Sequence, residues 1–160
     1  MSEIRERVFV ACPLAHAHGY LAQVLPTDSS ASSALELRVP LPGDSGGPGL
    51  THTVTVRCAP LTDPSHESEV WSISWTPREG IYPSFDGRIS IKGSEDYGTC
   101  RLVLEGSYEP PFGAPGRAFD AALGHRIAKA TARTLLRDIA RRMEEAYRAG
   151  EARKREELQH

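Results

Sequence analysis

The chain has 160 residues, of which 39 % are hydrophobic and 25 % charged, and its formal net charge at pH 7 is -2. These values are typical of one globular domain with a single hydrophobic core. A nucleic-acid-binding protein usually carries a basic surplus, so the charge argues against that class. Every apolar run is shorter than the ~20 residues that a membrane-spanning helix needs.

Three cysteines, Cys12, Cys58 and Cys100, lie in apolar stretches without C-x-x-C spacing. This pattern favours free, buried thiols in a reducing compartment. Residues 1–7 are charged and lead into a short apolar run, which is not the pattern of a secretory signal. We therefore expect a cytoplasmic protein without stable membrane insertion.

The N-terminal part predicts one strand followed by one helical segment. Segment 4–12 ends in a β-branched and aromatic run that is typical of a strand. Pro13 suits a first helical turn, and residues 14–25 carry apolar side chains at helical spacing. Gly19 weakens this helix or divides it into two pieces. Residues 26–33 form a polar, Ser-rich connection.

Five segments then alternate between apolar and polar residues, as half-buried strands do. They are 35–41, 50–60, 69–76, 85–93 and 97–108. The links between them are too short for parallel crossovers, so neighbouring strands are expected to pair antiparallel. Their predicted inward faces between residues 50 and 108 carry no Asp, Glu, Lys or Arg.

The C-terminal part predicts one long helix from about residue 116 to 148. Its apolar stripe runs through Phe119, Leu123, Ile127, Thr131, Leu135 and Ile139, and is widened by Leu136 and Met143. Such a helix is about 50 Å long, so its end should project past the sheet. Gly150 is a plausible stop. We expect one domain over residues 1–148 and a charged, frayed tail over residues 149–160.

A sheet that is apolar on one face must bury that face, and the long helix is the element that can cover it. The predicted fold class is α+β. In this arrangement a curved antiparallel sheet of six or seven strands wraps around the long C-terminal helix and encloses apolar space.

The order of elements resembles the START-like, or SRPBCC, superfamily over residues 4–148. The resemblance is topological and is carried by strand 8–10, helix 14–25, hairpin 85–108, and the exit Tyr108-Glu109-Pro110-Pro111-Phe112-Gly113 that leads into residues 116–120. It implies a helix-grip fold with a hydrophobic cavity between sheet and helix. Members of the superfamily usually have seven strands and two short helices after the first strand, whereas six strands and one helical segment are counted here. The resemblance therefore implies that a second short helix or a further strand lies in residues 26–34. Polyketide cyclases and aromatases, coenzyme-Q-binding proteins and lipid-transfer domains share this fold, so it does not imply one activity.

The apolar inward faces predict binding of a small hydrophobic ligand, with no cofactor and no metal. The same residues also fit an ordinary packed core. Gly87 and Gly106 either leave space for the ligand or mark bends in the sheet. The candidate lining consists of Trp71, Trp75, Phe85, Ile89, Leu102, Leu104, Tyr108, Phe119, Leu123, Ile127 and His52.

His52 shares a face with Val54 and Val56, which suggests that it points inward beside Tyr108. The pair could bind a ligand oxygen or transfer a proton, as in a cyclase- or aromatase-like enzyme. In the alternative interpretation His52 is solvated at the end of its strand. His125 lies off the main apolar stripe and is expected to be exposed. Whether the protein is an enzyme is left open.

A third hypothesis is an interaction module with a filled core. Its partner, or a second copy of the chain, would bind the projecting helix end at residues 140–158.

Overall fold

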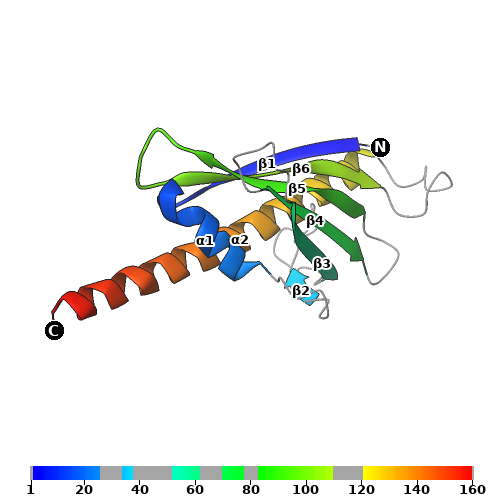
Figure 1. Ribbon diagram of the computed structural model, residues 1–160. Helices are drawn as coiled ribbons and strands as arrows, with labels where there is room; N and C mark the ends of the chain where they lie inside the picture. Colours follow the sequence, from blue (N-terminus) through cyan, green and yellow to red (C-terminus); the bar gives the residue numbers. More distant parts are fainter. Residues whose placement is uncertain are drawn as a thin grey trace, which may run out of the picture.

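The computed structural model describes residues 2–25, 34–37, 52–61, 70–77, 83–109 and 121–159. These residues form an antiparallel sheet, a short helix and a long C-terminal helix (Figure 1). The elements in chain order are β1 (Ser2–Val10), α1 (Leu14–Val24), β2 (Ala34–Leu37), β3 (His52–Leu61), β4 (Val70–Pro77), β5 (Ser84–Gly93), β6 (Cys100–Glu109) and α2 (Ala121–Leu158). The predicted helix or strand in residues 26–33 falls outside the described residues.

The strands that the structure describes pair antiparallel in the order β1-β6-β5-β4-β3-β2. Strands β2 to β6 form a meander, as their short links predict. Strand β1 instead joins the far edge beside β6, with Val8 opposite Leu102. The result is the predicted α+β architecture, with an open antiparallel sheet and a long C-terminal helix, which is consistent with a helix grip.

The predicted faces agree with the observed burial. On β4, Trp71, Ile73 and Trp75 are buried, whereas the serines between them are half-buried. The outer face carries one exception, because Ser90 on β5 and the opposed Val103 on β6 are also buried. The alternation of a half-buried strand therefore predicts which side chains the sheet turns inward.

Helix α1 is continuous through Gly19, which corrects the option that this glycine divides it. The carbonyl of Pro13 accepts hydrogen bonds from the N–H groups of His16 (3.0 Å) and Ala17 (3.1 Å), so the proline begins the helix as predicted. Ala17 and Leu21 are buried toward the core. One turn of apolar packing thus compensates for the weak helix propensity of the glycine.

Helix α2 has 38 residues and is therefore about 57 Å long. It crosses the inner side of the sheet beside β1, and its C-terminal end projects beyond the strands (Figure 1). The backbone N–H of Ala11, just after β1, donates to the Glu144 carboxylate at 3.0 Å and ties the two elements together. No helix in the described part of the chain is both long and apolar enough to cross a membrane.

The helix does not stop at Gly150, which corrects the expected end of α2. A Cβ atom at residue 150 would collide with the hydroxyl of Tyr20 on α1. The ring of Tyr20 also meets the ring of Tyr147 edge to face, with 6.0 Å between the centroids. The glycine therefore allows α1 to approach α2 closely, and α2 continues to Leu158.

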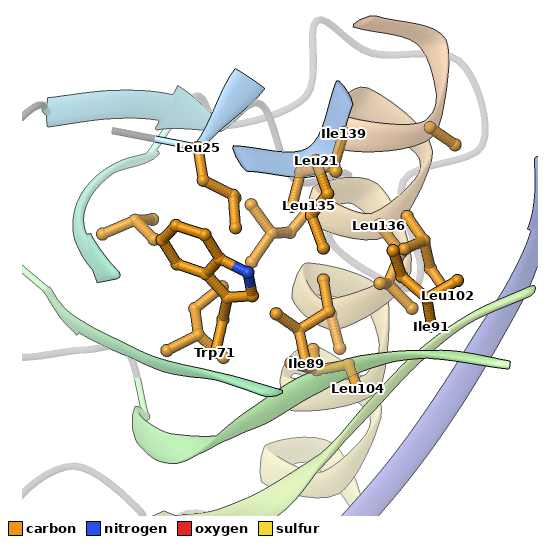
Figure 2. Packing of buried hydrophobic residues seen from close by; sticks show 14 of the residues in the cluster. Leu21, Leu25, Trp71, Ile89, Ile91, Leu102, Leu104, Leu135, Leu136 and Ile139 are labelled. Atoms are coloured by element: carbon orange, nitrogen blue, oxygen red, sulfur yellow. The ribbon is translucent and has the colours of Figure 1, made fainter. Parts of the chain in front are cut away.

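The core lies between the sheet, α1 and α2 (Figure 2). Leu21 and Leu25 reach it from the α1 segment, and Leu135, Leu136 and Ile139 reach it from α2. The sheet supplies Trp71, Ile89, Ile91, Leu102 and Leu104 at this level. Helix α1 thus closes one end of the space between sheet and long helix.

Gly87 and Gly106 lie opposite each other on β5 and β6. A Cβ atom on either residue would lie 2.7 Å from Cζ of Phe85 and would also collide with backbone of the opposite strand. The pair therefore permits close approach of the two strands, and the Phe85 ring fills the space beside it. This excludes the interpretation that the glycines leave room for a ligand, and it supports their role in shaping the sheet.

Candidate functional site

Three aromatic residues lie side by side on the inner face of β4, β5 and β6. We call Trp75, Phe85 and Tyr108 the aromatic row. The sheet register places Trp75 opposite Phe85 and Phe85 opposite Tyr108. The Trp75 and Phe85 rings are stacked, with centroids 4.2 Å apart and planes inclined by 15°. All three side chains are buried, so the row is an apolar wall of the interior.

Trp75 carries a buried polar atom that has no hydrogen-bond partner among the described residues. The residue is 1 % exposed, and no acceptor among the described residues hydrogen-bonds its indole Nε1. An unpaired buried donor costs about 1–3 kcal/mol, so native proteins rarely leave one. Because the indole N–H can only donate, a molecule that satisfied it would have to present an acceptor.

Tyr108 has a polar partner on the long helix. Its hydroxyl lies 3.4 Å from Nδ1 of His125, at the described N-terminal end of α2. The direction of this hydrogen bond depends on the imidazole tautomer. His125 is half-buried, which corrects the expectation that it is exposed. Because His125 lies beside the apolar stripe of α2 and not on it, its side chain reaches only the edge of the interior.

The other predicted lining residues divide into two groups. Trp71, Ile89, Leu102 and Leu104 are buried at the level that α1 closes (Figure 2), and Ile127 is buried on α2. Phe119 lies outside the described residues, as do the side chains of Leu123 and His52.

His52 and Tyr108 are not neighbours in the sheet. Strands β4 and β5 lie between β3, which carries His52, and β6, which carries Tyr108. Three strand spacings amount to about 14 Å along the sheet. The histidine that the tertiary structure brings to Tyr108 is His125. Sequence spacing on a single strand could not indicate this, because the contact joins a strand to a helix.

The three cysteines are free, as predicted: Cys12 and Cys100 are buried and Cys58 is half-buried. Burial raises the pKa of the Cys58 thiol to about 11. Burial, together with the neighbouring Cys12, likewise raises the pKa of Cys100 to about 11. A nucleophilic cysteine needs a low pKa, so the raised pKa values of Cys58 and Cys100 indicate thiols that pack in the fold and do not react.

The comparisons with known proteins support the fold. No family model matches the chain, and no curated protein matches its sequence significantly. The solved Zhui aromatase/cyclase from Streptomyces sp. R1128 aligns over 89 % of this chain and 93 % of its own, with a TM-score of 0.55 and 16 % identity. A START superfamily protein from Mycobacterium smegmatis aligns over 87 % and 97 %, with a TM-score of 0.42 and 14 % identity.

Identities this low carry information about the fold and not about activity. The aromatase/cyclase alignment covers nearly all of both chains at a TM-score of 0.55, so the two proteins share the overall arrangement of sheet and helices. The chain therefore has a START-like fold.

Proposed function

We propose that this protein binds a small hydrophobic ligand between the sheet and α2, against the aromatic row. The observation that carries the proposal is the buried indole N–H of Trp75, which has no acceptor in the part of the chain that the structure describes. A ligand with an apolar body and an oxygen acceptor would pack on the aromatic wall and complete this hydrogen bond. Tyr108 and His125 would offer a second polar anchor at the other end of the row.

The lining supports a largely apolar ligand. The buried residues on the inner faces of β4, β5 and β6 are apolar or aromatic, and none is charged. A charged ligand group would need a partner there to offset its loss of hydration. The START-like fold supports the same class of function, since Zhui, an aromatase/cyclase, has a similar fold.

Ligand extraction and a matched pair of variants test the proposal. Organic extracts of the purified protein are analysed by mass spectrometry, and the extracted compound is titrated back. Trp75→Phe keeps an aromatic ring but removes the donor, so affinity should fall about tenfold, which is the loss expected for about 1.4 kcal/mol. Trp71→Phe, on the same strand but at the level closed by α1, is the control. Extracts without a bound compound, or equal losses in both variants, would refute the proposal.

A cyclase- or aromatase-like enzyme is a second candidate, favoured by the Tyr108–His125 contact. A phenol hydroxyl next to an imidazole can relay a proton to or from a bound substrate. If turnover occurs, Tyr108→Phe and His125→Gln should each lower kcat by a larger factor than they weaken ligand binding. Turnover that persists in both variants would exclude the pair from the chemistry.

A further inference from the structure

A second site candidate lies on the opposite side of β1, away from the aromatic row. It is a hollow of about 600 Å³ where the outer face of β1, β6 and β5 meets the flank of α2. We call it the basic hollow. Its walls are Arg5, Arg7, Lys92, Arg101, Lys129, Arg133, Glu6 and Val103, so six of its eight residues are cationic and one is anionic.

Carboxylates compensate only part of this positive charge. Glu6 pairs with Lys129 at 3.5 Å and with Arg133 at 2.8 Å, which uses the single anion of the wall. Arg5 lies 3.8 Å from Glu105, a contact at the limit of an ion pair.

Three cations of the hollow form no ion pair with any of the described residues. Among the described residues, no carboxylate pairs with Arg7, Lys92 or Arg101, and the Arg101 guanidinium donates to the carbonyl of Gly93 instead. This local excess of positive charge contrasts with the net charge of the whole chain, which is -2.

The register explains why these side chains converge. Arg101 is opposite Phe9 on β1 and opposite Lys92 on β5, and Arg7 is opposite Val103 on β6. All of these positions are on the outer face, around the buried Val103. Charges on an edge strand can serve only to prevent edge-to-edge pairing with another molecule. Lys92 and Arg101, however, belong to inner strands, and Lys129 and Arg133 belong to a helix, so edge protection does not account for the cluster.

We propose that the basic hollow binds a phosphate-bearing anion. Guanidinium groups match the geometry of phosphate oxygens, and charge-assisted hydrogen bonds of this kind are among the stronger polar contacts. The uncompensated cations repel one another, and a multivalent anion would relieve that repulsion. Both a soluble phosphate compound and a phospholipid headgroup offer this chemistry. Exposed Phe9, 63 % accessible and opposite Arg101, would contact only the lipid.

The test measures pyrophosphate binding by calorimetry at low and high salt. The double variant Arg7→Gln/Lys92→Gln should weaken binding at least about tenfold, because it removes two charge-assisted contacts. The control Arg148→Gln/Lys154→Gln removes the same charge from the projecting part of α2 and should leave affinity within about twofold. Equal losses in both would assign the effect to net charge and overturn the proposal.

Vesicles of phosphatidylcholine with and without phosphatidic acid identify the source of the phosphate. Binding only to the anionic vesicles, reduced by Phe9→Ser and by Arg7→Gln/Lys92→Gln, supports the site with a lipid headgroup. Pyrophosphate binding that Phe9→Ser leaves unchanged, without vesicle binding, supports it with a soluble phosphate compound. Failure of the wild-type protein to bind either probe overturns the proposal and leaves the hydrophobic-ligand proposal unaffected.

Discussion

Single residues show how the fold accommodates buried polar groups. Glu6 lies on the inner face of β1, where an apolar residue would be expected, and its side chain is 9 % exposed. It is tolerated because β1 is an edge strand, which lets Lys129 and Arg133 reach it from α2 while staying partly solvated. Trp75 represents the opposite case, since its buried donor has no protein acceptor among the described residues. In the first arrangement two cations offset the buried carboxylate, and the second is the observation on which the ligand proposal rests.

Removing the closer partner of Glu6 should expose the cost of its burial. Arg133→Met leaves the carboxylate with the more distant Lys129, and we expect the free energy of unfolding to fall by about 1–2 kcal/mol. Arg137→Met, one turn further along α2 and exposed, is the matched control and should change it by less than about 0.5 kcal/mol. Urea unfolding at neutral pH measures both, and equal effects would show that the ion pair contributes little.

The burial of Cys100 predicts that the stability of the fold decreases at alkaline pH. Well below pH 9 its thiol is protonated in both the folded and the unfolded chain and has no effect on pH dependence. Between pH 9 and about 11 the unfolded chain loses this proton while the folded chain keeps it, so stability falls as pH rises. The slope contributed is up to about 1.4 kcal/mol per pH unit.

Denaturant unfolding of wild type and Cys100→Ala over this alkaline range isolates that contribution from those of other titrating groups. The variant should lose stability less steeply. Parallel curves for the two proteins would mean that the Cys100 thiol ionises as easily in the folded chain as in the unfolded one.

At the scale of elements, close backbone approach decides the shape of the sheet. Gly87 and Gly106 let β5 and β6 come together at a point where any side chain would strike backbone and the Phe85 ring. The same ring stacks on Trp75. The glycine pair therefore sets the position of the aromatic row indirectly, by fixing how the strands and Phe85 pack.

A matched pair of glycine substitutions tests this role. Gly87→Ala introduces a methyl group against backbone atoms that cannot move away easily, and should destabilise the protein by roughly 1–3 kcal/mol. Gly19→Ala, in α1 with no atom within 4 Å of the new methyl group, should stabilise it by about 0.5–1 kcal/mol. Thermal unfolding of both variants gives the comparison. A neutral Gly87→Ala would argue against the close approach.

At the scale of the whole molecule, α1 supports the long helix beyond the sheet. Tyr20 and His16 on α1 both meet the ring of Tyr147 on α2, with centroids 6.0 and 6.1 Å apart. Beyond Gly150 the side chains of α2 are mostly exposed and charged. The helix therefore has a part that is packed against α1 and an end that makes few contacts within the chain.

These two parts should respond differently to mutation. Tyr147→Ala removes the aromatic contacts with α1 and should lower the free energy of unfolding by about 1–2 kcal/mol. Deletion of residues 151–160 removes mainly exposed residues and should leave it within about 0.5 kcal/mol. Light scattering on the full-length and shortened proteins also tests the hypothesis that residues 140–158 bind a second copy. Equal molar masses for a monomer in both would reject self-association through this end.

The sequence by itself determined the strands, their buried faces and the long amphipathic helix, because periods of two and 3.6 residues are local properties. Helix Leu14–Val24 and the buried stripe through Ile127, Leu135 and Ile139 follow the predicted pattern. The candidate lining was predicted in the same way, through the inward faces of β4 to β6.

Only the tertiary structure decided which distant residues meet. Glu6 and Arg133 are 127 residues apart, and the partner of Tyr108 comes from a helix whose sequence pattern predicted an exposed histidine. Gly150 of α2 likewise lies against Tyr20 of another helix, where a Cβ atom would collide with the tyrosine hydroxyl. Such contacts form where the sheet order and the helix path bring surfaces together, and neither is encoded in the spacing of residues within one element.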